Sequence, residues 1–174
     1  MPNTIRLHKE HNNIDEWLGM SNEGTSVFIA ILVLSGSRIA NSEREKELVV
    51  WLAEHDQAVV GRGTVGFDIS EMPWTKDHFI QEKEFILKVI DGALSKLGWN
   101  VLNYEPNEEV IHHYLNKFKA LILDFDEKYI DESSYTEWIE LIDDEMCGIP
   151  NGFPKCPIHD TYLHFGGCVV CHDS

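Results

Sequence analysis

Residues 148–174 of this 174-residue chain cannot form another long helix, and this constrains the fold more than any other feature of the sequence. Gly148, Pro150, Gly152, Pro154 and Pro157 follow one another within a short stretch. Proline has no amide hydrogen to donate within a helix, and glycine loses more conformational entropy on folding than other residues. A segment of this composition needs an interaction other than helix packing to hold it in place.

The same segment carries two pairs of side chains that can bind a metal. Cys156 and His159 are separated by two residues, and so are Cys168 and Cys171. This spacing lets both side chains of a tight turn reach one ion, and four such ligands complete the tetrahedral shell of a structural zinc. The pattern therefore predicts a structural zinc site made of Cys156, His159, Cys168 and Cys171.

Residues 155–172 resemble a zinc ribbon or a zinc knuckle in this paired spacing. The eight-residue linker between the pairs is short for a full ribbon, so the resemblance implies a minimal zinc-bound β-hairpin packed on the rest of the chain. The fourth ligand stays open: His159 is preferred, but Cys147, His164 or His172 could replace it. Cys147 would give an all-cysteine shell, which is also typical of structural zinc.

The cysteine distribution indicates the cellular compartment. All four cysteines follow position 146, whereas disulfide frameworks of secreted proteins spread cysteines along the chain. The N-terminus shows no secretory signal, and the longest apolar run, 27–34, is much shorter than the roughly 20 residues that cross a bilayer. These features predict a soluble, cytoplasmic protein.

Hydrophobic periodicity predicts an all-α fold, with a helical domain over residues 1–147 and the zinc-binding tail over 148–174. The clearest helices begin near Thr75 and at Pro106, because each carries apolar residues at helical spacing over many positions. Another helix begins after Ser42, which forms a capping-box pattern with Glu45.

Three further helices are predicted from shorter patterns. Residues 13–20 have a short amphipathic pattern, and the apolar run 27–34 is read as a buried helix because no other strand nearby offers it a partner. The last helix begins near Ser134, and its inward-facing residues are expected to be Trp138, Leu141 and Ile142.

Two motifs that resemble functional sites lack the context that those sites need. Residues 61–66 read GRGTVG and match the dinucleotide fingerprint, but no helix can follow to bind phosphate at its N-terminus, so we interpret them as a glycine-rich turn. Glu109 and His112 have the spacing of di-iron bundles, which need a second copy that the chain lacks. A metal-dependent enzyme that uses Glu108, Glu109, His112 and His113 is the alternative function.

The charge of the chain excludes some classes of ligand. Fourteen basic and thirty acidic residues give a formal net charge of −16. Residues 101–147 alone contain three basic and thirteen acidic residues, a net charge of −10. Nucleic acids and anionic membranes both need a basic surface, so neither is the expected partner.

The densest acidic stretch predicts an interaction surface. Residues 124–145 contain ten acidic residues and Lys128 as their one basic residue, so pairs along the helix cannot balance the charge. We expect a basic protein partner to contact Glu137, Glu140, Asp143 and Asp144. In size and charge the chain also resembles the immunity proteins that neutralise bacterial polymorphic toxins, which implies a binding protein rather than an enzyme. No oligomeric state follows from the sequence.

Overall fold

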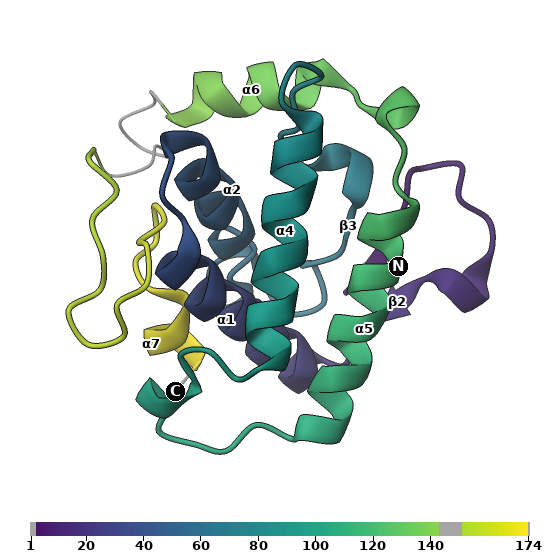
Figure 1. Ribbon diagram of the computed structural model, residues 1–174. Coiled ribbons are helices and arrows are strands. Elements are labelled where there is room, and N and C mark those ends of the chain that lie inside the picture. Colours follow the sequence, from purple (N-terminus) through teal and green to yellow (C-terminus); the bar gives the residue numbers. More distant parts are fainter. Residues whose placement is uncertain (1–2, 143–150, 174) are drawn as a thin grey trace.

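The computed structural model describes residues 3–142 and 151–173, which form a mainly helical fold (Figure 1). Seven α-helices lie within the described residues. They are α1 (Asn22–Ile39), α2 (Glu43–Ala53), α3 (Gln57–Val60), α4 (Phe79–Leu94), α5 (Glu108–Asp124), α6 (Glu132–Ile142) and α7 (Val169–Asp173). The strands are β1 (Thr4–Arg6), β2 (Leu18–Gly19) and β3 (Phe67–Asp68), and short 3-10 helices lie at Ile14–Glu16, Ile69–Glu71, Trp99–Val101 and Glu127–Tyr129.

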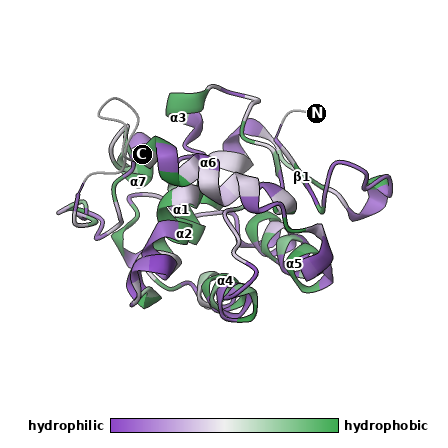
Figure 2. Ribbon diagram, turned by 90° about the horizontal axis from the view of Figure 1, so that it is seen from above, coloured by the Kyte–Doolittle hydropathy of each residue, from purple (hydrophilic) through white to green (hydrophobic). Residues whose placement is uncertain are grey.

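Helix α1 is the centre of the hydrophobic core. Residues 28–37 are all buried, and the helix contacts α2, α4, α5 and α7. A helix that is apolar on all sides must be surrounded by other elements, and this explains why the apolar run 27–34 is helical as predicted. Helix α5 instead buries one stripe: in Figure 2 its hydrophobic side faces the interior and its hydrophilic side faces outward.

The helices with strong local signals are confirmed. Ser42 Oγ accepts a hydrogen bond from the backbone N–H of Glu45, and the Glu45 carboxylate accepts one from the N–H of Ser42, so the predicted capping box begins α2. The two long apolar stripes form α4 and α5. Pro106, however, lies just outside α5, because Asn107 caps that helix by accepting from the N–H of Val110.

The all-α prediction is wrong in one region, where the chain forms a small mixed sheet of order β2-β1-β3. The predicted helix at 13–20 is a single 3-10 turn followed by β2. Leu18 pairs with Ile5 in the antiparallel ladder and is buried there, while β1 pairs in parallel with β3 through Ile5 and Phe67. Two turns of apolar spacing carry too little information to outweigh pairing with residues distant in the sequence.

Helix α6 begins two residues earlier than predicted. Asp131, rather than Ser134, accepts the hydrogen bond from the N–H of Ser133 at its start. Trp138 faces the core as predicted, but Leu141 is 52% exposed, so its prediction as a core residue is wrong. The side chain of Ile142 lies outside the described residues. In Figure 1, α6 crosses one end of the molecule above α2 and α4.

The tail contains no regular hairpin among its described residues, 151–173. Two isolated bridges, Lys155 with Tyr162 and His164 with Gly167, replace the predicted strands, and the second ligand pair lies at the short helix α7. The predicted domain boundary at residues 147 and 148 lies outside the described residues. None of the described helices combines the length and apolar character needed to cross a membrane.

Candidate metal centre

The first ligand pair lies on a tight turn. The N–H of Asp160 donates to the carbonyl of Cys156 at 2.8 Å, and the N–H of Cys156 donates to the carbonyl of Thr161 at 2.8 Å. Asp160 adopts the left-handed conformation, with φ of 56°, that closes this turn. The turn directs the side chains of Cys156 and His159 toward each other, with Sγ and Nδ1 3.7 Å apart.

The second pair is positioned by the start of helix α7. Two reciprocal backbone hydrogen bonds between His164 and Gly167 close the preceding turn, and Cys168 then precedes the first residue of α7. One helical turn brings Cys171 beside Cys168, whose sulfur accepts the N–H of Cys171 at 3.4 Å. The Thr161 hydroxyl lies 3.1 Å from the same sulfur.

The four side chains meet in a cluster that could hold a metal ion such as zinc. The His159 Nδ1 atom lies 3.7 Å from the sulfur of Cys168 and 3.4 Å from that of Cys171, and the sulfurs of Cys156 and Cys171 are 3.7 Å apart. Tetrahedral zinc with sulfur and imidazole ligands separates its ligand atoms by roughly 3.5–3.8 Å. The donor set therefore fits zinc in both chemistry and spacing.

The protonation of the cluster also fits a cation. Burial lowers the pKa of His159, which keeps the imidazole neutral and able to donate a lone pair. Burial opposes ionisation of Cys156, but the backbone N–H groups of His159 and Ile158 outweigh it and lower the pKa of this thiol. Burial and the neighbouring sulfurs raise the pKa of Cys171 to about 12, because thiolates this close repel unless a cation offsets their charge.

The C-terminal end of α1 anchors one side of the cluster. The Ser37 hydroxyl accepts the N–H of Tyr162 at 3.0 Å, and the Ser37 carbonyl accepts the Lys155 amino group at 2.9 Å. The Arg38 guanidinium donates to the carbonyl of His159 at 3.2 Å. These contacts join the two sides of the first turn to the helical body.

Asp56 anchors the other side, which the sequence did not predict. Its carboxylate caps α3 through the N–H of Ala58 and also lies 2.9 Å from His164 Nε2 and 2.5 Å from His172 Nδ1. Burial opposes the ionisation of Asp56, but the hydrogen bonds of both histidines outweigh it and lower its pKa. Both histidines named as alternative ligands therefore belong to a second cluster.

This second cluster, Asp56 with His164 and His172, also brings together three groups that could hold a metal ion, but hydrogen bonds already join these side chains to one another. The N–H of Gly166 donates to His164 Nδ1 at 3.0 Å, so the neutral ring carries its proton on Nε2 and donates it to Asp56. A metal on Nε2 would place a proton on Nδ1, where it would face the N–H of Gly166. The second cluster therefore docks the tail on α3 and leaves His159 as the histidine of the metal centre.

The other predicted site residues do not join either cluster. Glu108 forms an ion pair with Lys96, Glu109 and His113 are exposed, and the ring of His112 lies beside Trp99 at 6.3 Å between centroids. These four alternative catalytic residues bring no three ligand atoms together within the described residues. Glu137 and Glu140 are exposed on α6, while Asp143, Asp144 and Cys147 lie outside the described residues.

Comparison with models of protein families, with characterised proteins and with solved structures finds no match to the chain.

Proposed function

We propose that the chain is a binding protein stabilised by a structural zinc, and that it recognises a basic protein partner through the surface around α6. The proposal has two parts, a closed metal centre and an acidic surface, and the second part carries the function.

The metal centre supports a structural role because the chain supplies four ligands. Catalytic zinc keeps a position open for water or substrate, whereas structural zinc has a complete protein shell. Cys156, His159 and Cys168 are buried, and only Cys171 reaches the surface. A zinc here would join α7 to the first turn of the tail and so hold residues 156–171 together.

The acidic surface, called here the acidic face, extends from the end of α5 through α6. Its members are all exposed: Asp124, Asp126, Glu127, Asp131, Glu132, Glu137 and Glu140. Asp126 and Asp131 cap the helical turns that follow them. Among the described residues, the carboxylates of the other five form no hydrogen bond or ion pair, and this observation carries the proposal.

The basic residues near the acidic face offset only part of its charge: Lys9 acts on Asp131, and Lys128 lies over the ring of Tyr129. The Lys83 amino group donates to the carbonyls of Leu123 and Phe125, so it stabilises the C-terminal end of α5. Arg44 lies over the ring of Tyr135 and pairs with Glu47 and Glu82. The carboxylates therefore repel one another in the free protein, and a basic partner would relieve that repulsion. An immunity-type inhibitor of a cationic toxin is one protein of this kind.

Charge reversal tests the proposal. We expect Glu137→Lys with Glu140→Lys to lower the association rate with the partner that co-purifies from native cells by about tenfold at low salt, because complementary charge mainly accelerates encounter. The effect should shrink at high salt, where exposed charges are screened over a few ångströms. Stopped-flow or surface-plasmon measurements at several salt concentrations give this rate.

Glu105→Lys with Glu109→Lys is the matched control. This double variant changes the net charge by the same amount as the first, but its residues lie at the opposite end of α5. The helix rises about 1.5 Å per residue, so that end is about 25 Å from the acidic face. Equal association rates for the two double variants, or a rate that does not depend on salt, would remove the acidic face from the binding mechanism.

A further inference from the structure

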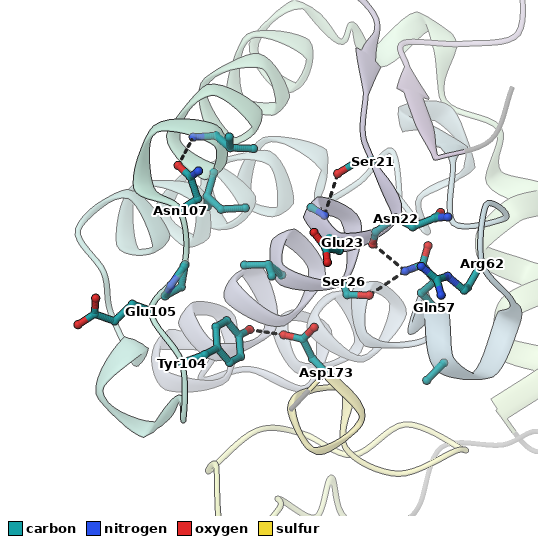
Figure 3. A pocket seen from close by; sticks show the side chains of 16 residues that line it. Ser21, Asn22, Glu23, Ser26, Gln57, Arg62, Tyr104, Glu105, Asn107 and Asp173 are labelled. Atoms are coloured by element: carbon teal, nitrogen blue, oxygen red, sulfur yellow. Dashed lines mark hydrogen bonds between the residues drawn. The ribbon is translucent and has the colours of Figure 1, made fainter.

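A cavity of about 610 Å³ lies at the end of the molecule where α1 and α5 begin. Its walls come from the first turns of α1 and α5, from α3, from the segment around Tyr104, and from the last residue of α7 (Figure 3). Sites for small organic ligands commonly have volumes between about 300 and 1,000 Å³ and combine apolar walls with a few polar groups. This cavity has both features, and the acidic face does not contribute to it.

The wall of the cavity is fixed by Gln57. Its amide nitrogen donates to the carbonyl of Asn22 and to the Ser26 hydroxyl, each at 2.8 Å, which joins α3 to the first turns of α1. Its amide oxygen accepts the N–H of Gly63 at 3.4 Å. These bonds all lie within the chain, and they hold this wall of the cavity in place.

The wall of the cavity formed by α7 is connected to the metal centre. Three consecutive residues of α7 contact three different parts of the molecule: Cys171 faces the metal cluster, His172 contacts Asp56, and Asp173 lines the cavity. The Tyr104 hydroxyl donates to one carboxylate oxygen of Asp173. The other oxygen has no hydrogen-bond partner among the described residues, and it can accept from a ligand.

The charges on the wall favour a cation. Glu23, Glu105 and Asp173 line the cavity together with Arg62, three acidic groups against one basic group. Figure 3 shows Glu105 directed away from the cavity, while Glu23 lies between α1 and the other walls. Neither Glu23 nor Glu105 forms an ion pair or a side-chain hydrogen bond with a described residue. The net charge of −16 raises the local concentration of cations further.

The apolar residues of the wall indicate that the ligand has a hydrocarbon part. Val27, Val110 and Ile111 line the cavity, and Val110 is 37% exposed although it is a large apolar residue. A fully hydrated inorganic cation would gain nothing from these side chains, whereas an organic amine would bury its hydrocarbon part against them.

We propose that this cavity binds a small organic cation, in which an ammonium group pairs with Asp173 and Glu23 and an apolar body contacts Val27 and Val110. Binding at this cavity is separate from recognition at the acidic face, so either proposal can fail without the other.

The probe for this proposal is 2-phenylethylamine, compared with its neutral analogue 2-phenylethanol and with the anion 3-phenylpropionate. Amide NMR spectra of the metal-loaded chain, recorded during titration, report both the affinity and the location. We expect the amine to shift the amides of Ser26, Ala58 and Val110, and to bind at least about tenfold more tightly than the alcohol, because a charged pair is lost in the alcohol.

Variants separate the cavity from general attraction of cations to an acidic protein. Asp173→Asn keeps an acceptor for the Tyr104 hydroxyl but removes the charge, and we expect it to weaken binding of the amine about tenfold or more. Glu23→Gln should weaken it in the same direction. Glu84→Gln removes an equal charge from an exposed side chain of α4 that does not line the cavity, and it should leave the affinity unchanged.

Three results would overturn the proposal. They are equal affinities for the amine and the alcohol, equal effects of Asp173→Asn and Glu84→Gln, and amide shifts that map to α6 instead of the cavity. Failure of the amine to bind at millimolar concentration would overturn it as well. None of these results depends on the basic protein partner or on variants of the acidic face.

Discussion

His159 and His164 lie five positions apart in the tail, yet their partners are entirely different. His159 faces three cysteines, while His164 is held between Asp56 and the N–H of Gly166. The spacing of Cys156 and His159 was enough to predict the first assignment. The second depends on Asp56, which is more than a hundred positions away, and no pattern within the tail could have revealed it.

Substitution of these histidines distinguishes their roles. We expect His159→Ala to lower the zinc content of the purified chain from one per molecule to a small fraction, because three ligands leave the shell incomplete. His172→Gln keeps a donor near Asp56 and should retain the metal. Elemental analysis of both variants after dialysis gives the answer, and a stoichiometric metal in His159→Ala would show that another residue is the fourth ligand.

Glu54 and His55 are neighbours whose ionisation is shifted in opposite directions. Burial raises the pKa of Glu54 to about 7, although the hydrogen bond from Trp138 opposes the shift, and burial lowers the pKa of His55 to about 4. The folded state therefore favours the protonated carboxyl of Glu54 and the neutral ring of His55. Each shift corresponds to a few kcal/mol of stability at most.

The two shifts predict opposite dependences of stability on pH. The contribution of Glu54 is complete below its unfolded pKa of 4.5 and is lost as the pH rises to about 7. The contribution of His55 is complete above 6.5 and is lost as the pH falls to about 4. The two effects largely cancel in the intact protein between pH 4.5 and 6.5.

Urea unfolding at several pH values separates the two effects. Relative to the intact protein, Glu54→Gln should gain stability as the pH rises from 4.5 to 7, and His55→Gln should gain stability as the pH falls from 6.5 to 4. Each difference is taken at the same pH, so acid effects on the metal centre cancel. Parallel curves for all three proteins would mean that neither group is perturbed.

Among the helices and strands, those formed by interactions between residues close in the sequence were predicted correctly, and those formed by pairing of distant residues were not. The capping box of Ser42 and Glu45 lies within one turn, and the apolar stripes of α4 and α5 extend over four turns or more, so local sequence determined both. Strands β1 and β3 are more than sixty positions apart and have two or three residues each. Their pairing depends on the burial of Ile5 and Phe67, which no local pattern contains.

In the tail, the sequence predicted the metal-binding side chains correctly but not the secondary structure that carries them. Paired spacing predicted which four side chains would meet, because each pair lies within one turn of the chain. It did not predict that the second pair would lie at a helix, because two buried residues between Cys168 and Cys171, Val169 and Val170, fit a strand as well as a helix. Contact of α7 with α1 and α3 decides between these structures.

At the scale of the whole molecule, the tail is part of the core and not a separate appendage. Cys156, Tyr162, Val169 and Val170 belong to the same buried cluster as the residues of α1. Hydrogen bonds from Ser37, Arg38 and Asp56 connect the tail to both α1 and α3. A metal ion bound at this cluster would therefore stabilise the helical body as well as the tail, and through α7 it would also position Asp173 in the cavity.

The zinc content of the purified chain decides whether the four-ligand cluster holds a structural metal. The chain is purified without added metal and without chelator, and its metals are determined by elemental analysis together with hydrogen exchange of the tail amides. We predict one zinc per chain and protected amides in residues 156–171, with protection lost when a strong chelator removes the ion, because structural zinc of this kind contributes roughly 10–16 kcal/mol of apparent binding free energy. A zinc content near zero in a protein whose tail amides are nevertheless protected would contradict the account.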